Sequence, residues 1–193
     1  MAEYLTNTTD LTSVANAIRT KGGTTAQLIY PSGFVSAINA IETGGGGGDE
    51  IVNSLIDRTI SGAYVNNTVT IVGRYGLANC ANLTSVVLPA VQLTGTNAML
   101  GCSALTKADF SNLQHIQHST FYGNKKLVTL IIRTQAVAKL DSTSAFRDTL
   151  IASGTGYVYV PSALVDSYKS ATNWSTYATQ IRAIEDYPDI TGV

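Results

Sequence analysis

A repeat with a period of 22 residues is the feature of this sequence that most restricts its fold. The segment that begins at Leu77 recurs with similar chemistry at Met99 and again at Phe121. The aligned columns are Leu77/Met99/Phe121, Leu83/Leu105/Leu127, Val86/Ala108/Leu130, Leu88/Phe110/Ile132 and the imperfect Leu93/His115/Val137. Self-similarity at a fixed period is the signature of stacked structural repeats, so we expect each copy to form one coil of a stack.

Each copy contains a Leu-x-x-apolar-x-apolar stretch, which predicts a strand whose alternate residues point inward. One coil cannot bury its own apolar side, but coils stacked at about 4.8 Å share a continuous core. The open ends of the stack need covers. At the first end we expect a short helix capped by Asp49. At the second end we expect a strand at Gly156–Pro161 and a helix from Ser162. Trp174 should pack on the last coil, with stacking on a ligand as the alternative role of its ring.

Three segments follow one another along the chain. Residues 1–43 predict a helical hairpin for attachment or oligomerisation, with apolar faces at Leu11, Val14 and Ile18 and at Phe34, Ile38 and Ile41. Gly44–Gly48 predict a flexible linker. Residues 49–193 are the expected head, with an N-terminal cap at 49–74, repeats at 75–140 and a C-terminal cap at 141–193. The alternative for the hairpin is that it docks on its own chain.

The low charge of the chain excludes some classes of partner. Charged residues are 13% of the sequence, the net charge is −1, and no basic cluster exceeds Lys125–Lys126. Nucleic-acid binding needs a basic surface that neutralises phosphates, so we expect no nucleic-acid partner. No apolar run approaches the roughly 18 residues of a membrane span, and polar Met1–Thr9 shows no targeting signal. We therefore expect no membrane association, and folding in a cytoplasm.

The sequence offers no residue set typical of a catalytic or metal site. His115 and His118 lie close together, but no nucleophile motif accompanies them. Cys80 and Cys102 occupy equivalent repeat positions and should lie about 5 Å apart, which permits a disulfide without requiring one. These four residues lack the spacing of a structural metal site. We expect no enzyme activity, metal or cofactor; the alternative is an ion shared by histidines of several chains in an oligomer.

The outward strand positions form the predicted binding face. Its rows are Ser85/Lys107/Thr129 and Val87/Asp109/Ile131, and Tyr122 is added as an aromatic contact. Repeat proteins commonly bind partners on such continuous faces. Exposed tyrosine together with Asn and Thr suits a sugar, because the ring stacks on C–H groups and the amides hydrogen-bond to hydroxyls. The alternative is that the tyrosines only cover the edges of the coils.

The cysteine-containing copies resemble a known class of repeats. The stretches LANCANLTSVVLP and MLGCSALTKADF look like the BspA-like class of leucine-rich repeats. The ending GYVYVPSALVDSYKSATNWSTYATQIRAIED is similar to the cap that often follows such repeats. The resemblance implies an α+β repeat fold, a short leucine-rich-repeat solenoid with helical caps, preceded here by the N-terminal helical hairpin. The third copy departs from the pattern, because Asn124 replaces the cysteine.

The start of the chain carries a second resemblance. DLTSVANAIRTKGGTTAQLIYPSGFVSAINAI resembles an N-terminal module of structural proteins encoded by phages and prophages of Gram-positive bacteria. It implies a non-enzymatic virion protein of a tail fibre or baseplate, which binds other virion proteins through residues 1–43 and a host-surface polysaccharide or protein receptor through the head. We expect a homo-oligomer, with a trimer as the first hypothesis.

A hydrolytic enzyme is one alternative, against which the sparse carboxylates argue, and three further functions remain open at this point. The first is a capsid-displayed head fibre or decoration protein. The second is a BspA-like bacterial surface adhesin, against which the missing secretion signal argues. The third is an intracellular protein-interaction scaffold.

Overall fold

The computed structural model describes residues 50–51 and 58–192 of the 193-residue chain. The chain divides into two units between Asp49 and Glu50, and the described residues belong to the second unit, Glu50–Val193. The predicted helical hairpin of residues 1–43 and the glycine linker lie outside the described residues.

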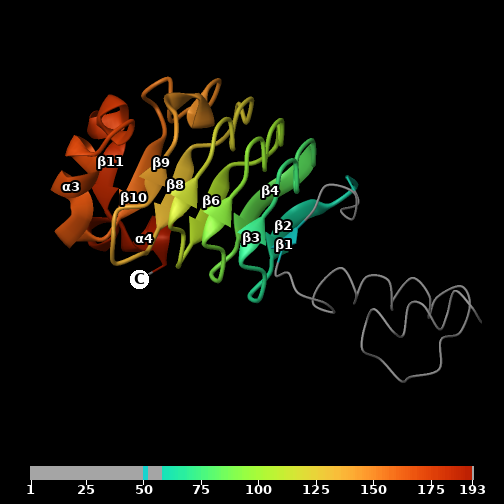
Figure 1. Ribbon diagram of the computed structural model, residues 1–193, viewed down its shortest axis with the longest axis horizontal. Coiled ribbons are helices and arrows are strands. Elements are labelled where there is room, and N and C mark those ends of the chain that lie inside the picture. The colour runs from blue at the N-terminus through green and yellow to red at the C-terminus, as the bar shows by residue number, and fades with distance from the viewer. Residues whose placement is uncertain (1–49, 52–57, 193) are drawn as a thin grey trace, which may run out of the picture. The chain divides into compact units, whose positions relative to one another are not determined.

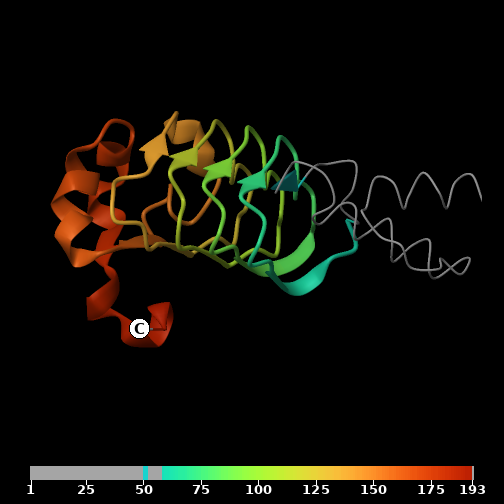
Figure 2. The same ribbon diagram turned by 60° about the horizontal axis from the view of Figure 1, so that its bottom comes forward.

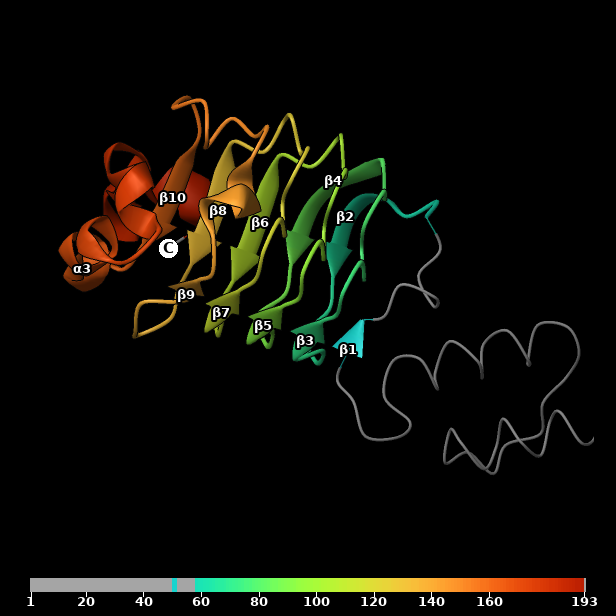
Figure 3. The same ribbon diagram turned by 45° about the horizontal axis from the view of Figure 1, so that its top comes forward.

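Two parallel sheets form most of the described unit (Figure 1). The main sheet has the strand order β11-β10-β8-β6-β4-β2, and the small sheet has the order β1-β3-β5-β7-β9. The strands of the main sheet are β2 (Ser61–Val65), β4 (Asn82–Val87), β6 (Lys107–Phe110), β8 (Thr129–Ile132), β10 (Tyr157–Val160) and β11 (Ile181–Ala183). Those of the small sheet are β1 (Glu50–Ile51), β3 (Ile71–Val72), β5 (Leu93–Thr94), β7 (His115–Ile116) and β9 (Lys139–Leu140). Figure 3 shows the small sheet as a row of short strands beside the row formed by the main sheet.

The pairing register repeats the period of the sequence. In the main sheet Ser85 lies beside Lys107, which lies beside Thr129, and in the small sheet Leu93 lies beside His115. Each step is 22 residues, so the strand columns of the sequence are confirmed as rows of neighbouring coils. The pairing extends beyond the predicted repeat segment, because β3 pairs with β5 and β10 pairs with β8. The fold is thus a leucine-rich-repeat type with parallel sheets and short helices.

The expected helix capped by Asp49 is wrong at its first two described residues. Glu50 and Ile51 form strand β1, which pairs in parallel with β3. The Ile51 carbonyl accepts a 2.8 Å hydrogen bond from the Gly73 amide, and the Ile51 side chain is buried. A strand in this position continues the ladder of the small sheet and satisfies backbone groups at its edge. The rest of the expected helix, residues 52–57, lies outside the described residues.

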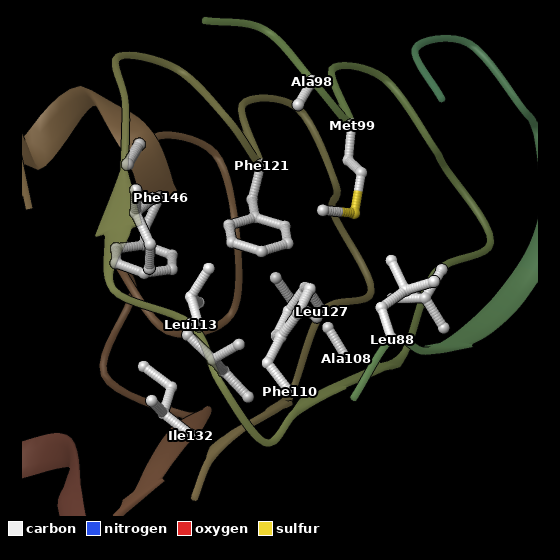
Figure 4. Close-up of a cluster of buried hydrophobic side chains, with 14 of the residues drawn as sticks. Leu88, Ala98, Met99, Ala108, Phe110, Leu113, Phe121, Leu127, Ile132 and Phe146 are labelled. Atoms are coloured by element: carbon white, nitrogen blue, oxygen red, sulfur yellow. The ribbon is translucent and has the colours of Figure 1, made fainter. Parts of the chain in front are cut away.

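The apolar columns meet in a core between the two sheets. Figure 4 shows Met99 and Phe121 pointing into the coil from one side, toward Leu88 and Phe110 on the other. All four side chains are fully buried. The Phe121 ring stacks on Phe146 with 5.6 Å between centroids and meets Phe110 edge-on at 6.5 Å. Burial of each such side chain contributes about 1.5–3 kcal/mol relative to exposure, so these columns hold successive coils together.

A ladder of turns forms the third side of the stack, and we call it the turn side. The Leu77 and Met99 amides donate to carbonyls of the next coil at 2.7 and 2.9 Å. Each turn also contains a residue in the left-handed region, and the equivalent residues are Asn79, Gly101 and Gly123, with φ of 61°, 69° and 77°. Glycine and asparagine adopt this conformation with the least strain, which explains their recurrence at this position.

Short helices follow the coils toward the C-terminus. They are η1 (Thr143–Phe146), η2 (Ser162–Leu164), α3 (Val165–Ser170), η3 (Trp174–Gln180), η4 (Ile184–Asp186) and α4 (Pro188–Thr191), where η marks a 3₁₀ helix. The strand and helix predicted at this end are confirmed by β10, η2 and α3. None of the described helices has the length and apolar character needed to cross a membrane.

The segment from α3 to η3 caps the last coil, as the sequence predicts for Trp174. The Trp174 side chain is fully buried, and its ring lies 5.7 Å from Phe146 between centroids. Its Nε1 donates a 2.7 Å hydrogen bond to the Ala138 carbonyl. The Ala138 amide in turn donates to the Tyr168 hydroxyl at 2.9 Å. The cap therefore supplies both apolar contact and hydrogen-bond partners to the last coil, and the predicted packing is confirmed.

Residues 184–192, which we call the C-terminal tail, return across the outer face of the main sheet (Figure 2). Ile184 joins Ile131 of β8 and Tyr159 of β10 in a second apolar cluster, apart from the main core. Farther along the tail, the Ile190 carbonyl accepts a 2.9 Å hydrogen bond from the Lys107 ammonium on β6. The tail thus contacts three neighbouring strands of the main sheet.

Candidate functional site

The outer face of the main sheet carries the residues predicted to bind a partner. The register places them in the two expected rows, Ser85/Lys107/Thr129 and Val87/Asp109/Ile131. The first row and Val87 are half-buried. Asp109 and Ile131 are 8% and 0% exposed. The face exists as predicted, but part of it is not open to solvent.

Ile131 and Asp109 are wrong as exposed binding positions. Ile131 is covered by Tyr159 and by Ile184 of the C-terminal tail. Asp109 binds Arg133 through two hydrogen bonds, Nε to Oδ1 at 3.0 Å and Nη2 to Oδ2 at 2.8 Å. This bidentate contact raises the pKa of Arg133. The apolar side chain of Ile131 at an outward strand position is thus explained by its burial under the C-terminal tail.

Tyr122 is wrong as a member of this face. It lies in the turn after Phe121, on the turn side of the coil rather than on the main sheet. The Arg147 guanidinium lies 5.3 Å from the centroid of the Tyr122 ring. This cation–π contact takes up one face of the half-buried Tyr122 ring.

Part of the outer face remains exposed over β2 and β4. Val65 is 58% exposed and lies beside the half-buried Val87. In the C-terminal tail, Ile190 and Tyr187 are 41% and 36% exposed. These are the exposed large apolar side chains of the described unit, and Val65 and Ile190 share the outer face of the main sheet. Scattered exposed apolar residues are normal on a protein surface, so this strip carries no strong indication of a ligand.

The loops between the two sheets change length along the stack. The imperfect column Leu93/His115/Val137 is wrong at its third member, because His115 pairs with Lys139. Since Phe110 still pairs with Ile132, the 133–138 loop is two residues longer than the 111–114 loop. The ends of the longer loop stay in the ladder, through hydrogen bonds of its flanking amides to the preceding coil. The two extra residues must therefore be accommodated in its middle.

A hollow of about 630 Å³ lies between these two loops, and we call it the loop hollow. The side chains used in the following argument are Asn112, Leu113, Gln114, Arg133, Gln135 and Val137. Leu113 is fully buried and Val137 half-buried, while the three amide side chains are exposed. The hollow combines apolar residues with hydrogen-bonding groups, which is the usual composition of a small-molecule site.

The charge of the loop hollow is balanced within the protein. Arg133 is the charged residue of its lining, and Asp109 holds this guanidinium in the bidentate ion pair described above. The amide of Asn112 donates to the Pro89 carbonyl at 2.9 Å, which fixes its orientation. Among the described residues, the Gln114 and Gln135 side chains make no hydrogen bond to the protein. Both amides are therefore available to a ligand as donors and acceptors.

A second hollow, of about 540 Å³, lies between the strand β9 region and residues 171–174 of the cap. Asp141 Oδ1 in its lining is 2.8 Å from Lys139 Nζ and 2.9 Å from His115 Nε2. The hydrogen bond with Lys139, and secondarily that with His115, lowers the pKa of Asp141. Trp174 belongs to the lining, but its buried ring is used in packing. The polar groups here already bind one another, so this hollow is the weaker candidate.

The buried thiols do not form a reactive site. Cys80 and Cys102 are not joined by a disulfide, and both side chains are fully buried. The Cys102 thiol donates to the Leu77 carbonyl at 3.0 Å, and its hydrogen bond with Cys80 together with burial raises its pKa. A nucleophile or metal ligand needs the thiolate, which this environment disfavours. Among the described residues, no group of three or more His, Cys, Asp or Glu side chains is placed to hold a metal ion.

The sequence reasoning missed the loop hollow, and the sequence carries little signal for it. In the fifth column the polar member is His115, which keeps its register with Leu93, whereas Val137 is apolar and hides the shift of the pairing to Lys139. The insertion lies between Ile132 and Lys139, where the hollow forms.

Residues 57–156 match the family model described as the BspA type leucine rich repeat region, in six copies. Among solved structures, the chain is similar to a leucine rich cell surface protein from Faecalibacterium prausnitzii A2-165, with 23% sequence identity and a TM-score of 0.44. The likeness covers 63% of this chain and 31% of that protein's chain, so this chain spans less than a third of its length. No curated protein matches this chain significantly.

Proposed function

Because the chain belongs to the family of BspA type leucine-rich repeat proteins, we propose that its repeat unit is a non-enzymatic recognition head. In this proposal the chain is a phage or prophage virion protein of a tail fibre or baseplate. The head binds a host-surface component, such as a cell-wall polysaccharide or a protein receptor. Residues 1–43 bind other virion proteins and further copies of the chain, with a trimer as the first hypothesis.

The observation that carries the recognition role is the regular stack of coils. Backbone hydrogen bonds join successive coils on the turn side, and parallel pairing joins them in both sheets. Such a stack holds its surface side chains in fixed positions over several coils, which suits recognition of an extended partner. With 13% charged residues in the chain, a partner would meet mostly neutral hydrogen-bonding groups.

The non-enzymatic part of the proposal is supported by how several of the described ionisable groups are used. Asp109 binds Arg133, and Asp141 binds Lys139 and His115. The raised pKa of Cys102 disfavours its thiolate. A catalytic acid, base or nucleophile must be able to reach a reacting atom in the required protonation state. These groups instead bind one another or lie in the core.

The virion placement is supported by the sequence before the head. Residues 10–41 resemble the N-terminal module of phage and prophage structural proteins, and the Gly44–Gly48 run separates them from the coils. This order suits an anchor followed by an exposed head, assembled in the cytoplasm of a bacterial host. Display on the capsid as a head fibre or decoration protein would use the same order of anchor and head.

A binding experiment with two lengths of the chain tests this function. The full chain and a chain that begins at Asp49 are mixed separately with purified virions and with bacterial cell walls, and the bound fraction is measured. We expect the full chain to bind both targets and the shorter chain to bind walls only. The control is Phe34→Asp in the full chain, which should lose virion binding and keep wall binding.

Other outcomes would contradict the proposal in different ways. Wall binding by both lengths without any virion binding would favour a bacterial surface adhesin. Binding of neither target would overturn the proposal and favour a protein-interaction scaffold. Turnover of wall glycans by the full chain would contradict the non-enzymatic part.

A further inference from the structure

We propose that the loop hollow binds one neutral sugar unit of a glycan, held by the side-chain amides of Gln114 and Gln135. This inference rests on the proposed function and assigns it a site and a ligand class. The predicted binding face on the main sheet is a different surface, and part of it is covered by the C-terminal tail.

The hollow exists because one loop is longer than its neighbour. In the shorter loop, the backbone N–H of Gln114 donates a 2.8 Å hydrogen bond to the backbone carbonyl of Gln92 in the preceding coil, so these loops stack closely. The 133–138 loop contains two more residues than the 111–114 loop, while its two ends keep the register. The surplus chain cannot lie flat on the coil below. The repeat is thus interrupted at this corner, and a concave site replaces the close stacking found between the earlier loops.

The size and lining of the hollow suit a sugar ring. Its volume of about 630 Å³ lies within the roughly 300–1,000 Å³ of small-molecule sites. The apolar side chains of Leu113 and Val137 offer contact to the C–H groups of a ring. Gln114 and Gln135 lie one on each loop, and each amide presents both donors and an acceptor. A sugar hydroxyl is both a donor and an acceptor, so it can use both kinds of group at once.

The charge balance selects a neutral sugar over an anionic one. The lining contains the cation Arg133, but its guanidinium makes two hydrogen bonds with Asp109, which is 8% exposed. A phosphate or carboxylate that took Arg133 as its partner would leave the Asp109 carboxylate largely buried beside it and without that partner. Leaving one charge of a buried pair uncompensated is strongly unfavourable. A neutral ligand can use the amides while the ion pair stays intact.

Titration of the full chain with small sugars tests the site directly. The side-chain amide signals of Gln114 and Gln135 are followed by NMR while glucose, galactose, rhamnose or N-acetylglucosamine is added, with glycerol phosphate as the anionic probe. We expect at least one neutral sugar to shift both amide signals with a Kd of about 1 mM, which corresponds to about −4.1 kcal/mol. Glycerol phosphate should leave them unchanged. Absence of any shift with these neutral sugars, or a larger shift with glycerol phosphate, would overturn the proposal.

The repeat supplies a matched control for the variants. Gln92 occupies the position of Gln114 one coil earlier and is also exposed, but it is not part of the lining. The double variant Gln114→Ala/Gln135→Ala should weaken sugar binding at least tenfold, whereas Gln92→Ala should leave the affinity unchanged. An equal effect of both changes would overturn the assignment.

Wall binding separates this inference from the function on which it rests. If the full chain binds walls and the double variant binds them equally well, the site is overturned and the proposed function stands. If sugars shift the two amides in the expected way but the chain binds neither walls nor virions, the site stands and the proposed function fails.

Discussion

Asn124 occupies the column in which the two preceding coils carry a cysteine. Cys80 and Cys102 fill this position with small, buried side chains, and the Cys102 thiol donates to a carbonyl of the preceding coil. Asn124 is also fully buried, yet its Oδ1 and Nδ2 atoms have no hydrogen-bond partner among the described residues. A buried amide in this situation costs about 1–3 kcal/mol. Asn124 should therefore stabilise the third coil less than a cysteine would at the same position.

Asn124→Cys should consequently raise the free energy of unfolding by about 1 kcal/mol, because it removes the buried amide and restores the pattern of the column. Urea unfolding under reducing conditions measures the difference. Asn82→Cys, at an exposed position of β4, is the control and should change stability by less than about 0.5 kcal/mol. A loss of more than 1 kcal/mol in Asn124→Cys would show that the amide is well satisfied where it stands.

The buried Cys102 thiol should make the head less stable at alkaline pH. In the folded chain the Cys102 pKa is raised, first by its hydrogen bond with Cys80 and then by burial. The unfolded chain releases this proton near the ordinary thiol pKa of about 8.5, while the folded chain keeps it. Above that pH the unfolded state binds fewer protons, so the free energy of unfolding falls as the pH rises.

We expect the fall to approach about 1.4 kcal/mol per pH unit for the Cys102 thiol between pH 8.5 and 9.5. Urea unfolding at a series of pH values gives this slope. In Cys102→Ala the slope should be smaller, whatever the absolute stability of that variant. An unchanged slope in the variant would contradict the prediction, as would rapid modification of Cys102 by a thiol reagent in the native state.

At the scale of elements, the strands of the main sheet could be predicted and several other features could not. The columns through Leu83, Val86 and Leu88 alternate inward and outward, so they define strand, register and core from the sequence alone. The small sheet left a weaker signal, because each of its strands in the described unit has two residues and is held by backbone hydrogen bonds. At Glu50 and Ile51 the helix expected after Asp49 was wrong for the same reason, since both residues belong to that ladder.

The contribution of the C-terminal cap to stability can be tested with variants of its buried aromatic residues. Trp174→Ala should destabilise the head by about 3–5 kcal/mol, because the ring is fully buried against Phe146. Tyr168→Phe should cost about 1–3 kcal/mol, since it leaves the buried Ala138 amide without the hydroxyl that accepts its hydrogen bond. Chemical denaturation measures both. Thr172→Ala, at an exposed position nearby, is the control and should be nearly neutral.

A result in which Trp174→Ala matched the exposed control would mean that the last coil does not depend on its cap. The aromatic contacts of the cap are the reason why we expect Trp174→Ala to be much more destabilising than the control. The Trp174 ring also meets Tyr168 edge-on, with 5.1 Å between centroids. This one change would thus remove the ring contacts that Phe146 and Tyr168 make with Trp174.

At the scale of the whole described unit, the C-terminal tail decides how much of the main sheet is open. The sequence correctly predicted which residues of the binding face lie side by side, because the strand register follows from the period of the repeat. Their exposure was not predictable, since nothing local to Ile131 indicates that Tyr159 and Ile184 cover it. The loop hollow was missed for a related reason, because it depends on the difference between two loops rather than on either one.

A chain that ends after Ala183 should be less stable and more prone to self-association. Its shortening removes Ile184, which is buried against Ile131 and Tyr159, and exposes an apolar patch on the main sheet. Thermal unfolding and light scattering after size-exclusion chromatography measure the two effects. A chain that ends after Ile190 keeps the contacts of Ile184 and Ile190 and is the control. Equal Tm and equal mass per particle for the two shortened chains would contradict the covering role of the tail.

The repeating register has a consequence for how such a gene can change. Each coil meets its two neighbours through the same backbone ladder, and most of its core contacts are with adjacent coils. An in-frame duplication or loss of the coding segment for one repeat would therefore leave every remaining junction equivalent to one already present. The insertion between Ile132 and Lys139 shows that a corner can also accept extra residues without loss of register on either side. Lineages of this gene could thus vary the reach of the protein and the shape of its surface in separate, heritable steps.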